Sequence, residues 1–333
     1  MRFGLFGGAR TKRGVGLEDS QGYESFIDYV IEADRLGFKQ LFMVEHHFTG
    51  QGQVSSSMTV LAYLAARTRH IRLGTAVVVM PWHNPVLVAE QVATLDLLSG
   101  GRVDFGVGKG YRQAEFDGFC IPIDEATERF DEAMEVIKQG WMSHETTGGR
   151  FSHHGKRWHY DNIVVEPAPL QRPHPPLWLA AGSPDSIRRA AREGYNLLLD
   201  QLAQTDQIIR RIALFKEECR KVGRAYHPGL VATARALQMI HGESERAEAY
   251  ATRQRVLSVI GDLARDKLAD RVEDDTAPLL GTPDEIIARL KELEAGGATN
   301  ILLVDPNASV RNLQAFAREV MPSFEASRYA AAE

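Results

Sequence analysis

Residues Ile71–Tyr111 have the sequence IRLGTAVVVMPWHNPVLVAEQVATLDLLSGGRVDFGVGKGY, and this stretch decides the fold class. Its first part, Ile71–Met80, is rich in β-branched residues, which is typical of a strand buried on both faces. A helix is predicted at Pro85–Leu98, and Gly100-Gly101 mark its end. A second strand is predicted at Arg102–Gly108. A strand, a helix and another strand in immediate succession indicate a parallel sheet whose strands are connected by helices.

The same alternation extends toward both ends of the chain. The other predicted strands are Arg2–Gly7, Gln40–His47, Leu177–Ala181, Asn196–Asp200, Leu230–Ile240 and Asn300–Val304. The other predicted helices are Ser25–Phe38, Met58–Thr68, Asp124–Trp141, Asp185–Glu193, Thr205–Val222, Pro283–Ala295 and Val310–Val320. Eight strand–helix units favour an α/β fold of the (β/α)₈ TIM-like barrel type over an open doubly wound sheet. In addition, Gly4, Gly7 and Gly8 do not have the GxGxxG spacing of a dinucleotide-binding sheet.

Two stretches interrupt this alternation. Residues 142–175 contain five of the eleven histidines and hairpin-like segments, and we predict that they form an insertion that acts as a lid. A long charged helical stretch indicates a second, helical insertion at about 244–280. We therefore expect a single barrel domain at 1–325 with these two insertions, followed by a tail at 326–333.

The composition excludes several classes of function. The 333 residues carry a formal net charge of −5 without a basic block, so neither nucleic acid nor an anionic membrane is an expected partner. The cysteines, Cys120 and Cys219, form no CxxC pair, which argues against zinc ribbons and redox motifs. No stretch reaches 18 consecutive apolar residues, and the N-terminal apolar run is too short for a signal peptide. We therefore expect a cytoplasmic protein.

Candidate residues for chemistry come from the C-terminal ends of the strands, where barrel enzymes place their sites. The second predicted strand ends in Glu45-His46-His47-Phe48. A histidine here could act as an acid or base near neutral pH. Alternation along a strand would let only one of the two face the barrel mouth. A histidine that is simply packed or solvated is an equal alternative.

A phosphate site is the second candidate. Gly182-Ser183 precedes a predicted helix, whose N-terminal N–H groups and dipole favour an anion. Lys109, at another strand end, could add a positive charge. The alternatives are an ordinary helix cap at Ser183 and a solvated loop lysine at Lys109. At the end of the first strand, Phe6-Gly7 leaves room for a planar ligand to approach the backbone.

The histidines of the 142–175 insertion, which include His153, His154 and His159, raise the question of a metal site. No cysteine or carboxylate spacing supports a zinc cluster there. A lid or a solvated loop is the favoured interpretation, and we predict no metal.

Three segments together resemble the bacterial luciferase-like family of flavin-dependent monooxygenases. They are EHHF at 45–48, the stretch Ile71–Tyr111, and LAAGSPDSI at Leu179–Ile187. The resemblance covers essentially the whole chain and is strongest from Gly37 to Arg129. It implies a luciferase-like barrel that acts as a homodimer. It also implies reduced FMN at the C-terminal mouth of the barrel, supplied by a separate flavin reductase.

The resemblance also assigns roles to residues. His46 matches the histidine that the family uses near the flavin, and the Ala76–Val77 bond matches the position of a non-prolyl cis peptide beneath the isoalloxazine ring. Lys109 stands where relatives commonly carry an arginine, and lysine lacks the bidentate fork of the guanidinium. The cofactor-binding residues implied in this way are Phe6, Gly7, Ala76, Val77, Lys109, Tyr111, Gly182 and Ser183.

The implied reaction begins with reduced FMN and O₂, which form a C4a-peroxide that oxygenates a small apolar organic substrate. His46 is the expected catalytic residue. The aromatic residues expected at the mouth suit such a substrate: Phe6, Phe48, Trp82 and Tyr111. Two alternatives stay open, namely F420-dependent hydride transfer on the same fold and a flavin-binding protein without activity. The anionic tail of F420 favours a basic strip, and only Lys109 and Arg112 are present at this strand end.

Overall fold

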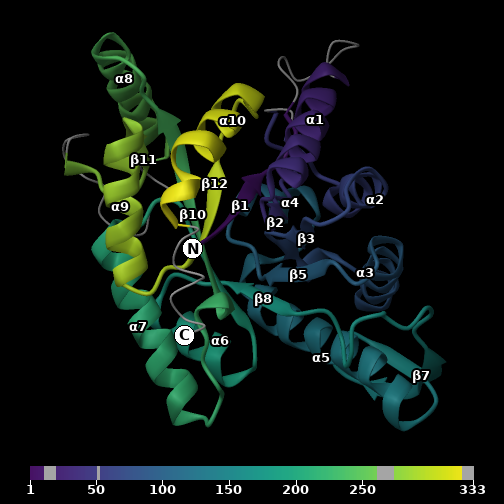
Figure 1. The fold of residues 1–333 in the computed structure, drawn as a ribbon. Coiled ribbons are helices and arrows are strands. Elements are labelled where there is room, and N and C mark those ends of the chain that lie inside the picture. The colour runs from purple at the N-terminus through teal and green to yellow at the C-terminus, as the bar shows by residue number, and fades with distance from the viewer. Residues whose placement is uncertain (11–19, 51–52, 261–273, 325–333) are drawn as a thin grey trace, which may run out of the picture. The chain divides into compact units, whose positions relative to one another are not determined.

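The computed structural model describes residues 1–10, 20–50, 53–260 and 274–324 (Figure 1). These residues fall into two compact units. The first unit consists of residues 1–7, 35–39 and the described chain from 181 onward, and the second of the described residues from 8 to 34 and from 40 to 180. Each unit contains four of the eight strands that the barrel prediction requires, and helices alternate with these strands along the chain.

The strands of the main sheet in the second unit are parallel and almost entirely buried, as expected for strands that helices cover. Their order is β2 (Gln40–Met43), β3 (Arg72–Thr75), β5 (Val103–Gly108) and β8 (Leu177–Ala180), with the short strand β4 (Val78–Val79) also paired to β5. The helices along this part of the chain are α1 (Ser20–Leu36), α2 (Ser57–Arg67), α3 (Pro85–Ser99), α4 (Gln113–Gly118) and α5 (Ala126–Thr146).

The first unit has a parallel sheet of its own, in which β10 lies between neighbours on both sides. The order is β9 (Asn196–Leu199), β10 (Val231–Met239), β12 (Asn300–Val304) and β1 (Arg2–Gly7), and β11 (Leu279–Gly281) pairs with the C-terminal part of β10. The helices are α6 (Pro184–Arg192), α7 (Thr205–Lys221), α8 (Glu243–Ile260), α9 (Pro283–Ala295) and α10 (Val310–Glu319), and α6 and α7 lie side by side (Figure 1).

The helix ends follow sequence rules. The Asn84 side chain accepts hydrogen bonds from the N–H groups of Val86 and Leu87, and Pro85 follows in the first helical turn of α3. At its other end, Gly100 adopts the left-handed conformation with φ 67°. Such signals explain why helix positions were predictable within a few residues. No helix among the described residues is long and apolar enough to cross a membrane.

The second predicted strand is shorter than expected, which is a correction. Strand β2 ends at Met43, not at His47, because the chain then leaves the sheet and the N–H of His46 donates to the carbonyl of Val54. Phe48 follows in the left-handed conformation, at φ 56°. The inference that only one of His46 and His47 can point into the site, which required a regular strand, therefore does not apply.

The predicted strand Ile71–Met80 is also wrong as one element. It is divided into β3 and β4 by Ala76 and Val77, whose peptide bond is cis, and Met80–Trp82 forms a 3-10 turn. A β-branched run carries no periodicity that marks such a break. The helix predicted at Asp124–Trp141 starts at Ala126 and continues to Thr146, so the first residues of the predicted insertion belong to α5.

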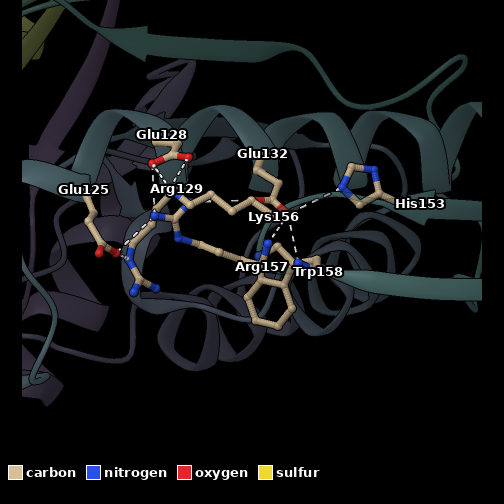
Figure 2. A network of polar contacts seen from close by, with 8 residues as sticks. All are labelled: Glu125, Glu128, Arg129, Glu132, His153, Lys156, Arg157 and Trp158. Atoms are coloured by element: carbon tan, nitrogen blue, oxygen red, sulfur yellow. Dashed lines mark hydrogen bonds and ion pairs between the residues drawn. The ribbon is translucent and has the colours of Figure 1, made fainter.

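The rest of that insertion contains the predicted hairpin. Strands β6 (Arg150–His154) and β7 (His159–Val164) pair in antiparallel fashion. Glu132 of α5 holds the turn between them, as Figure 2 shows, because its Oε1 accepts hydrogen bonds from the backbone N–H groups of Arg157 and Trp158, both at 2.8 Å. A Cβ at Gly155 would overlap the Glu132 carboxylate, so the turn requires glycine there.

Ion pairs extend the attachment of the hairpin to α5. The Arg157 guanidinium lies 3.1 Å from both Glu125 and Glu128, and Lys156 lies 2.9 Å from Glu128 (Figure 2). Glu132 lies 3.7 Å from Nε2 of His153, which is buried. These contacts fix the hairpin turn to one face of the helix. The predicted tail at 326–333 and part of the predicted 244–280 insertion lie outside the described residues.

Candidate functional site

The loop that follows β2 carries the main group of polar side chains in the second unit. Nδ1 of His46 lies 3.1 Å from Oε1 of Glu115, and the backbone N–H of His47 donates to the same oxygen at 3.0 Å. The side chain of Glu115 is only 5% exposed, while that of His46 is 19% exposed. Glu115 therefore holds both the ring of His46 and the backbone that carries it, and leaves Nε2 of His46 as the ring nitrogen that Glu115 does not occupy.

The electrostatics of Glu115 favour its charged form. Burial raises the pKa of this carboxyl, but the hydrogen bonds from His46 and from the backbone of His47 lower it by more. The pKa of Glu115 is therefore below its ordinary value. A carboxylate beside the imidazole fixes the tautomer with the proton on Nδ1 and stabilises the imidazolium when the ring takes a second proton.

Glu45 forms a second centre, which we call the Glu45 cluster: Glu45, His47, Trp82 and His83. Oε1 of Glu45 faces His83 Nε2 at 3.0 Å, His47 Nε2 at 3.3 Å and Trp82 Nε1 at 3.4 Å. Burial raises the pKa of Glu45, but the hydrogen bonds from His47 and His83 outweigh it and bring the pKa to about 2. The carboxylate thus ties the β2 loop to the segment after β4.

The depressed pKa of Glu45 predicts a pH effect on stability. A carboxyl whose pKa falls from 4.5 to about 2 on folding stabilises the protein above pH 4.5, and this contribution is lost as the pH falls toward 2. We expect about 3 kcal/mol of unfolding free energy to disappear over that window. Urea unfolding at a series of pH values measures it. The Glu45→Gln variant should lack this component, and an equally steep acid dependence in that variant would contradict the assignment.

An aromatic group lies over the same loop. Trp82 stacks on Phe119 with centroids 5.0 Å apart and meets Phe116 edge-on, also at 5.0 Å. Phe119 in turn contacts His47 at 4.8 Å and Phe48 at 4.9 Å. The Phe48 ring, 61% exposed, occupies the space where a Cβ at position 118 would lie. These rings give the loop an apolar wall on which an organic ligand can pack.

Alternate glycines allow β5 to run against the interrupted strand. A Cβ at Gly106 would overlap the carbonyl oxygen of Thr75, and one at Gly108 would lie 2.6 Å from Val77. Thr75 Oγ1 donates to the Gly106 carbonyl at 2.7 Å and accepts from its N–H at 3.0 Å. The predicted residues Ala76 and Val77 are thereby held beside β5, and their peptide bond is cis, as the resemblance implied.

Lys109 and Tyr111 follow β5 at the same end of the strand. Nζ of Lys109 donates to Oγ1 of Thr127 at 3.1 Å in an exposed position. Tyr111 is 54% exposed, and the guanidinium of Arg112 lies 5.7 Å from its ring centroid. The second unit therefore brings His46, Ala76, Val77, Lys109 and Tyr111 to neighbouring strand ends.

The other predicted residues belong to the first unit. Gly7 ends β1 with φ 150°, and a Cβ there would meet no described atom within 4 Å, so there is room beside Phe6-Gly7. Ser183 is the N-cap of α6: its Oγ accepts from the N–H of Ser186 at 3.4 Å. The cap alternative is thus realised: Pro184 has no N–H, and the N–H groups of Ser186 and Ile187 are bound to Ser183.

Two residues of the site were missed by sequence reasoning. Glu115 lies on α4, a helix of six residues that has no recognisable apolar periodicity. Arg211 of α7 pairs with Asp200 at 3.0 Å, and a Cβ at Gly182 would lie 3.5 Å from its Nη2. No signal in the sequence joined either of them to the predicted residues. Among the described residues, no group of three or more histidine, cysteine or acidic side chains is arranged to hold a metal ion.

Comparison with known sequences gives a consistent result. The family model for luciferase-like monooxygenases matches residues 1–300. The oxygenase component of a flavin-dependent trigonelline monooxygenase from Acinetobacter baylyi is 27% identical, and the match covers 98% of this chain and 97% of that protein. An uncharacterised Sinorhizobium fredii protein is 34% identical over 58% of this chain. The matched region covers only 53% of that relative.

Solved structures show the same fold. The monooxygenase RslO1 from Streptomyces bottropensis superposes with a TM-score of 0.82 at 27% identity, over 97% of this chain and all of that one. The oxygenating constituent of 3,6-diketocamphane monooxygenase from Pseudomonas putida, in complex with FMN, has a TM-score of 0.78 at 18% identity, over 97% and 98% of the two chains. An F420-dependent secondary alcohol dehydrogenase has a TM-score of 0.75 at 17% identity, with the same coverage. The predicted (β/α)₈ barrel is confirmed.

Proposed function

Because this chain belongs to the luciferase-like monooxygenase family, we propose that it oxygenates a small apolar organic substrate with reduced FMN and O₂. The observation that carries the proposal is the pair of His46 and Glu115, a mostly buried imidazole held by a buried carboxylate beside an aromatic wall. The relatives named as flavin-dependent oxygenases support the reaction class.

The residues present fit a flavin. Gly7 leaves open space at the end of β1, and Gly106 and Gly108 let β5 lie close against Thr75 and Val77 at the end of β3. Arg211 and the start of α6 at Ser183 suit a phosphate in the first unit, and Lys109 offers a positive charge in the second. When bound, reduced FMN supplies the two electrons and the activation of O₂. Phe6, Gly7, Ala76, Val77, Lys109, Tyr111, Gly182 and Ser183 remain our proposed cofactor-binding residues.

The protein's own chemistry then concerns a proton. With Nδ1–H of His46 directed at Glu115, Nε2 is free to accept a proton from a reacting oxygen or to return it. The negative charge of Glu115 stabilises the imidazolium in between. The rings of Trp82, Phe116 and Phe119 keep water from one side of this loop, which strengthens every polar interaction there.

An anaerobic titration tests the reaction class. Purified protein is mixed with reduced FMN, and separately with reduced F420, and each mixture is then combined with air-saturated buffer. We expect binding of reduced FMN and an absorbance transient that depends on oxygen. Binding of F420 with no oxygen-dependent transient would instead support F420-dependent hydride transfer as the function. One neighbour of the same fold is named as an F420-dependent secondary alcohol dehydrogenase. Flavin binding without turnover on any substrate would indicate a non-catalytic protein.

The partners are proposals of the same kind. A separate reductase is proposed because one full-length relative is named as an oxygenase component. A homodimer is proposed because large apolar side chains on neighbouring helices α2 and α3 are about half exposed: Tyr63, Leu87, Leu97 and Leu98. Sedimentation of the purified protein measures the oligomeric state. We also propose a cytoplasmic location and expect no nucleic acid or membrane partner.

The insertion that contains the hairpin is proposed as a lid, and its contacts limit how it can move. Opening at the turn must break the two backbone hydrogen bonds to Glu132. We expect Glu132→Ala to accelerate amide hydrogen exchange of Arg157 and Trp158 at least tenfold. Without the carboxylate, these two N–H groups lose the hydrogen bonds that protect them from exchange. Exchange in β5 should not change. Unaltered exchange at the turn would show that Glu132 does not hold the hairpin.

A further inference from the structure

A polar pocket of about 220 Å³ lies in the first unit, far along the chain from the residues discussed so far. Helices α8 and α9 form its sides, and the segment before β11 closes it. Its polar groups come from Arg246, Tyr250, Asp275, Glu285 and Arg289. A pocket of this size holds a small ion or the head group of a small molecule.

Several buried guanidinium nitrogens near this pocket have no hydrogen-bond partner among the described residues. Arg253 is 5% exposed and donates through Nε to Asp275 at 2.6 Å, but its Nη2 has no acceptor. Nη1 of Arg289, on the pocket wall, is buried and also lacks one. So do Nε and Nη2 of Arg235, a fully buried side chain whose Nη1 donates to the carbonyl of Ala203.

A buried N–H group without an acceptor lowers the stability of a folded protein. A guanidinium cannot lose its proton at neutral pH, so it must find acceptors or leave N–H groups dehydrated and unpaired. Buried donors without partners are rare in native proteins. Arg235, Arg253 and Arg289 each keep a buried N–H without a partner, which indicates an acceptor that the described residues do not provide.

The balance of charge points to an anion. Two carboxylates of the pocket, Asp275 and Glu285, are already engaged by Arg253 and Arg246. Arg289 has Glu292 3.7 Å from its Nε, on a half-exposed side of the helix. Arg235 has no carboxylate within ion-pair distance among the described residues, and burial lowers its pKa to about 10. Among the described residues named here, four arginines thus stand against three carboxylates: Arg235, Arg246, Arg253 and Arg289 against Asp275, Glu285 and Glu292.

We propose that this pocket binds a small oxyanion, of the carboxylate or phosphate-monoester class, with Arg289 as the residue that contacts it. The planar, fixed donors of a guanidinium match two oxygens of such a group. Arg253, which is bound to the lining residue Asp275, and Arg235, which interacts electrostatically with Asp275, supply further positive charge. Arg289 is not one of the proposed flavin-binding residues, and the proposal does not depend on the reaction class.

Calorimetric titration with inorganic phosphate and, separately, with acetate tests the site at constant ionic strength. Both titrations are made on the free protein and on protein saturated with oxidised FMN, so that a flavin-phosphate site is occupied in the second series. We expect one molecule of probe to bind to the FMN-saturated protein, and the same site to bind it in the free protein. Arg289→Gln should weaken that binding about tenfold or more, the effect of removing one charged hydrogen bond. Arg318→Gln, which changes an exposed arginine on α10, should not alter it.

The outcomes are distinct. Binding of phosphate alone assigns a phosphate group, and binding of acetate assigns a carboxylate. Arg289→Lys keeps the charge but not the fork, so it should bind more weakly than the wild type and more tightly than Arg289→Gln. It also serves as the test if the glutamine variant does not fold. If the wild type binds neither probe, or if Arg289→Gln and Arg289→Lys bind like the wild type, the proposal is wrong, whatever is found for FMN.

Discussion

The His46→Ala variant is expected to turn over about 10²–10⁴-fold more slowly than the wild type, the usual contribution of a positioned acid–base group. Binding of reduced FMN should change little, because the imidazole contributes one side chain among many flavin contacts. Glu115 is expected to tolerate the loss in a folded protein, since it keeps its hydrogen bond from the backbone N–H of His47. Stopped-flow mixing of reduced-flavin enzyme with oxygen and substrate measures both quantities.

Two variants sharpen this result. His154→Ala changes a histidine that is 63% exposed on the hairpin, and it should keep wild-type turnover. Glu115→Gln retains a hydrogen-bond acceptor for His46 but removes the negative charge. It should therefore slow turnover less than His46→Ala does, because the ring keeps a partner that orients it. Normal turnover in His46→Ala, with the fold and flavin binding intact, would sink the assignment of this histidine.

The Gly106→Ala variant is expected to have the largest effect on stability. Its methyl group would overlap the carbonyl oxygen of Thr75, which is backbone and cannot rotate away. Relief requires β5 to separate from β3, which also strains both hydrogen bonds between Thr75 and Gly106. Overpacking of a tight site costs about 1–3 kcal/mol, and we expect the upper end of that range or more.

Urea unfolding of Gly106→Ala is best compared with that of Gly242→Ala. The nearest described atom to a Cβ at Gly242 is Oγ of Ser244, at 3.8 Å, which is ordinary van der Waals contact. The control should lie within about 0.5 kcal/mol of the wild type. If the two variants unfold at similar urea concentrations, β5 and β3 are not as tightly apposed as described.

The alternation of strands and helices was predictable because each element carries its own local signal. The β-branched runs, the cap at Asn84 and the glycines after α3 all lie within one element and need no knowledge of the rest of the chain. The interruption at Ala76 has no such signal. It depends on how closely β5 approaches Thr75 and Val77. Gly106 and Gly108 allow this close approach, but glycines in a sequence do not show which residues they will contact.

The candidate site was predictable only in part, for a similar reason. His46 and Lys109 stand next to strand ends, and sequence reasoning can find such positions. Glu115 acts through a contact with a residue 69 positions away, and its helix is too short to show a periodic pattern. Three different elements carry the arginines with unpartnered N–H groups, Arg235, Arg253 and Arg289. The lack of acceptors is therefore seen only in the three-dimensional structure.

The arrangement around Glu45 has a consequence for how this sequence can drift over generations. One oxygen atom of Glu45 faces three donors from two separated segments. If one donor is replaced, the buried carboxylate has fewer hydrogen bonds to offset its loss of water. Aspartate is too short to reach all three, and an apolar residue would strand two imidazoles and an indole. Positions 45, 47, 82 and 83 should therefore be inherited as a block. Descendants that lose one should have exchanged the others as well, leaving a signature of correlated replacement across the lineage.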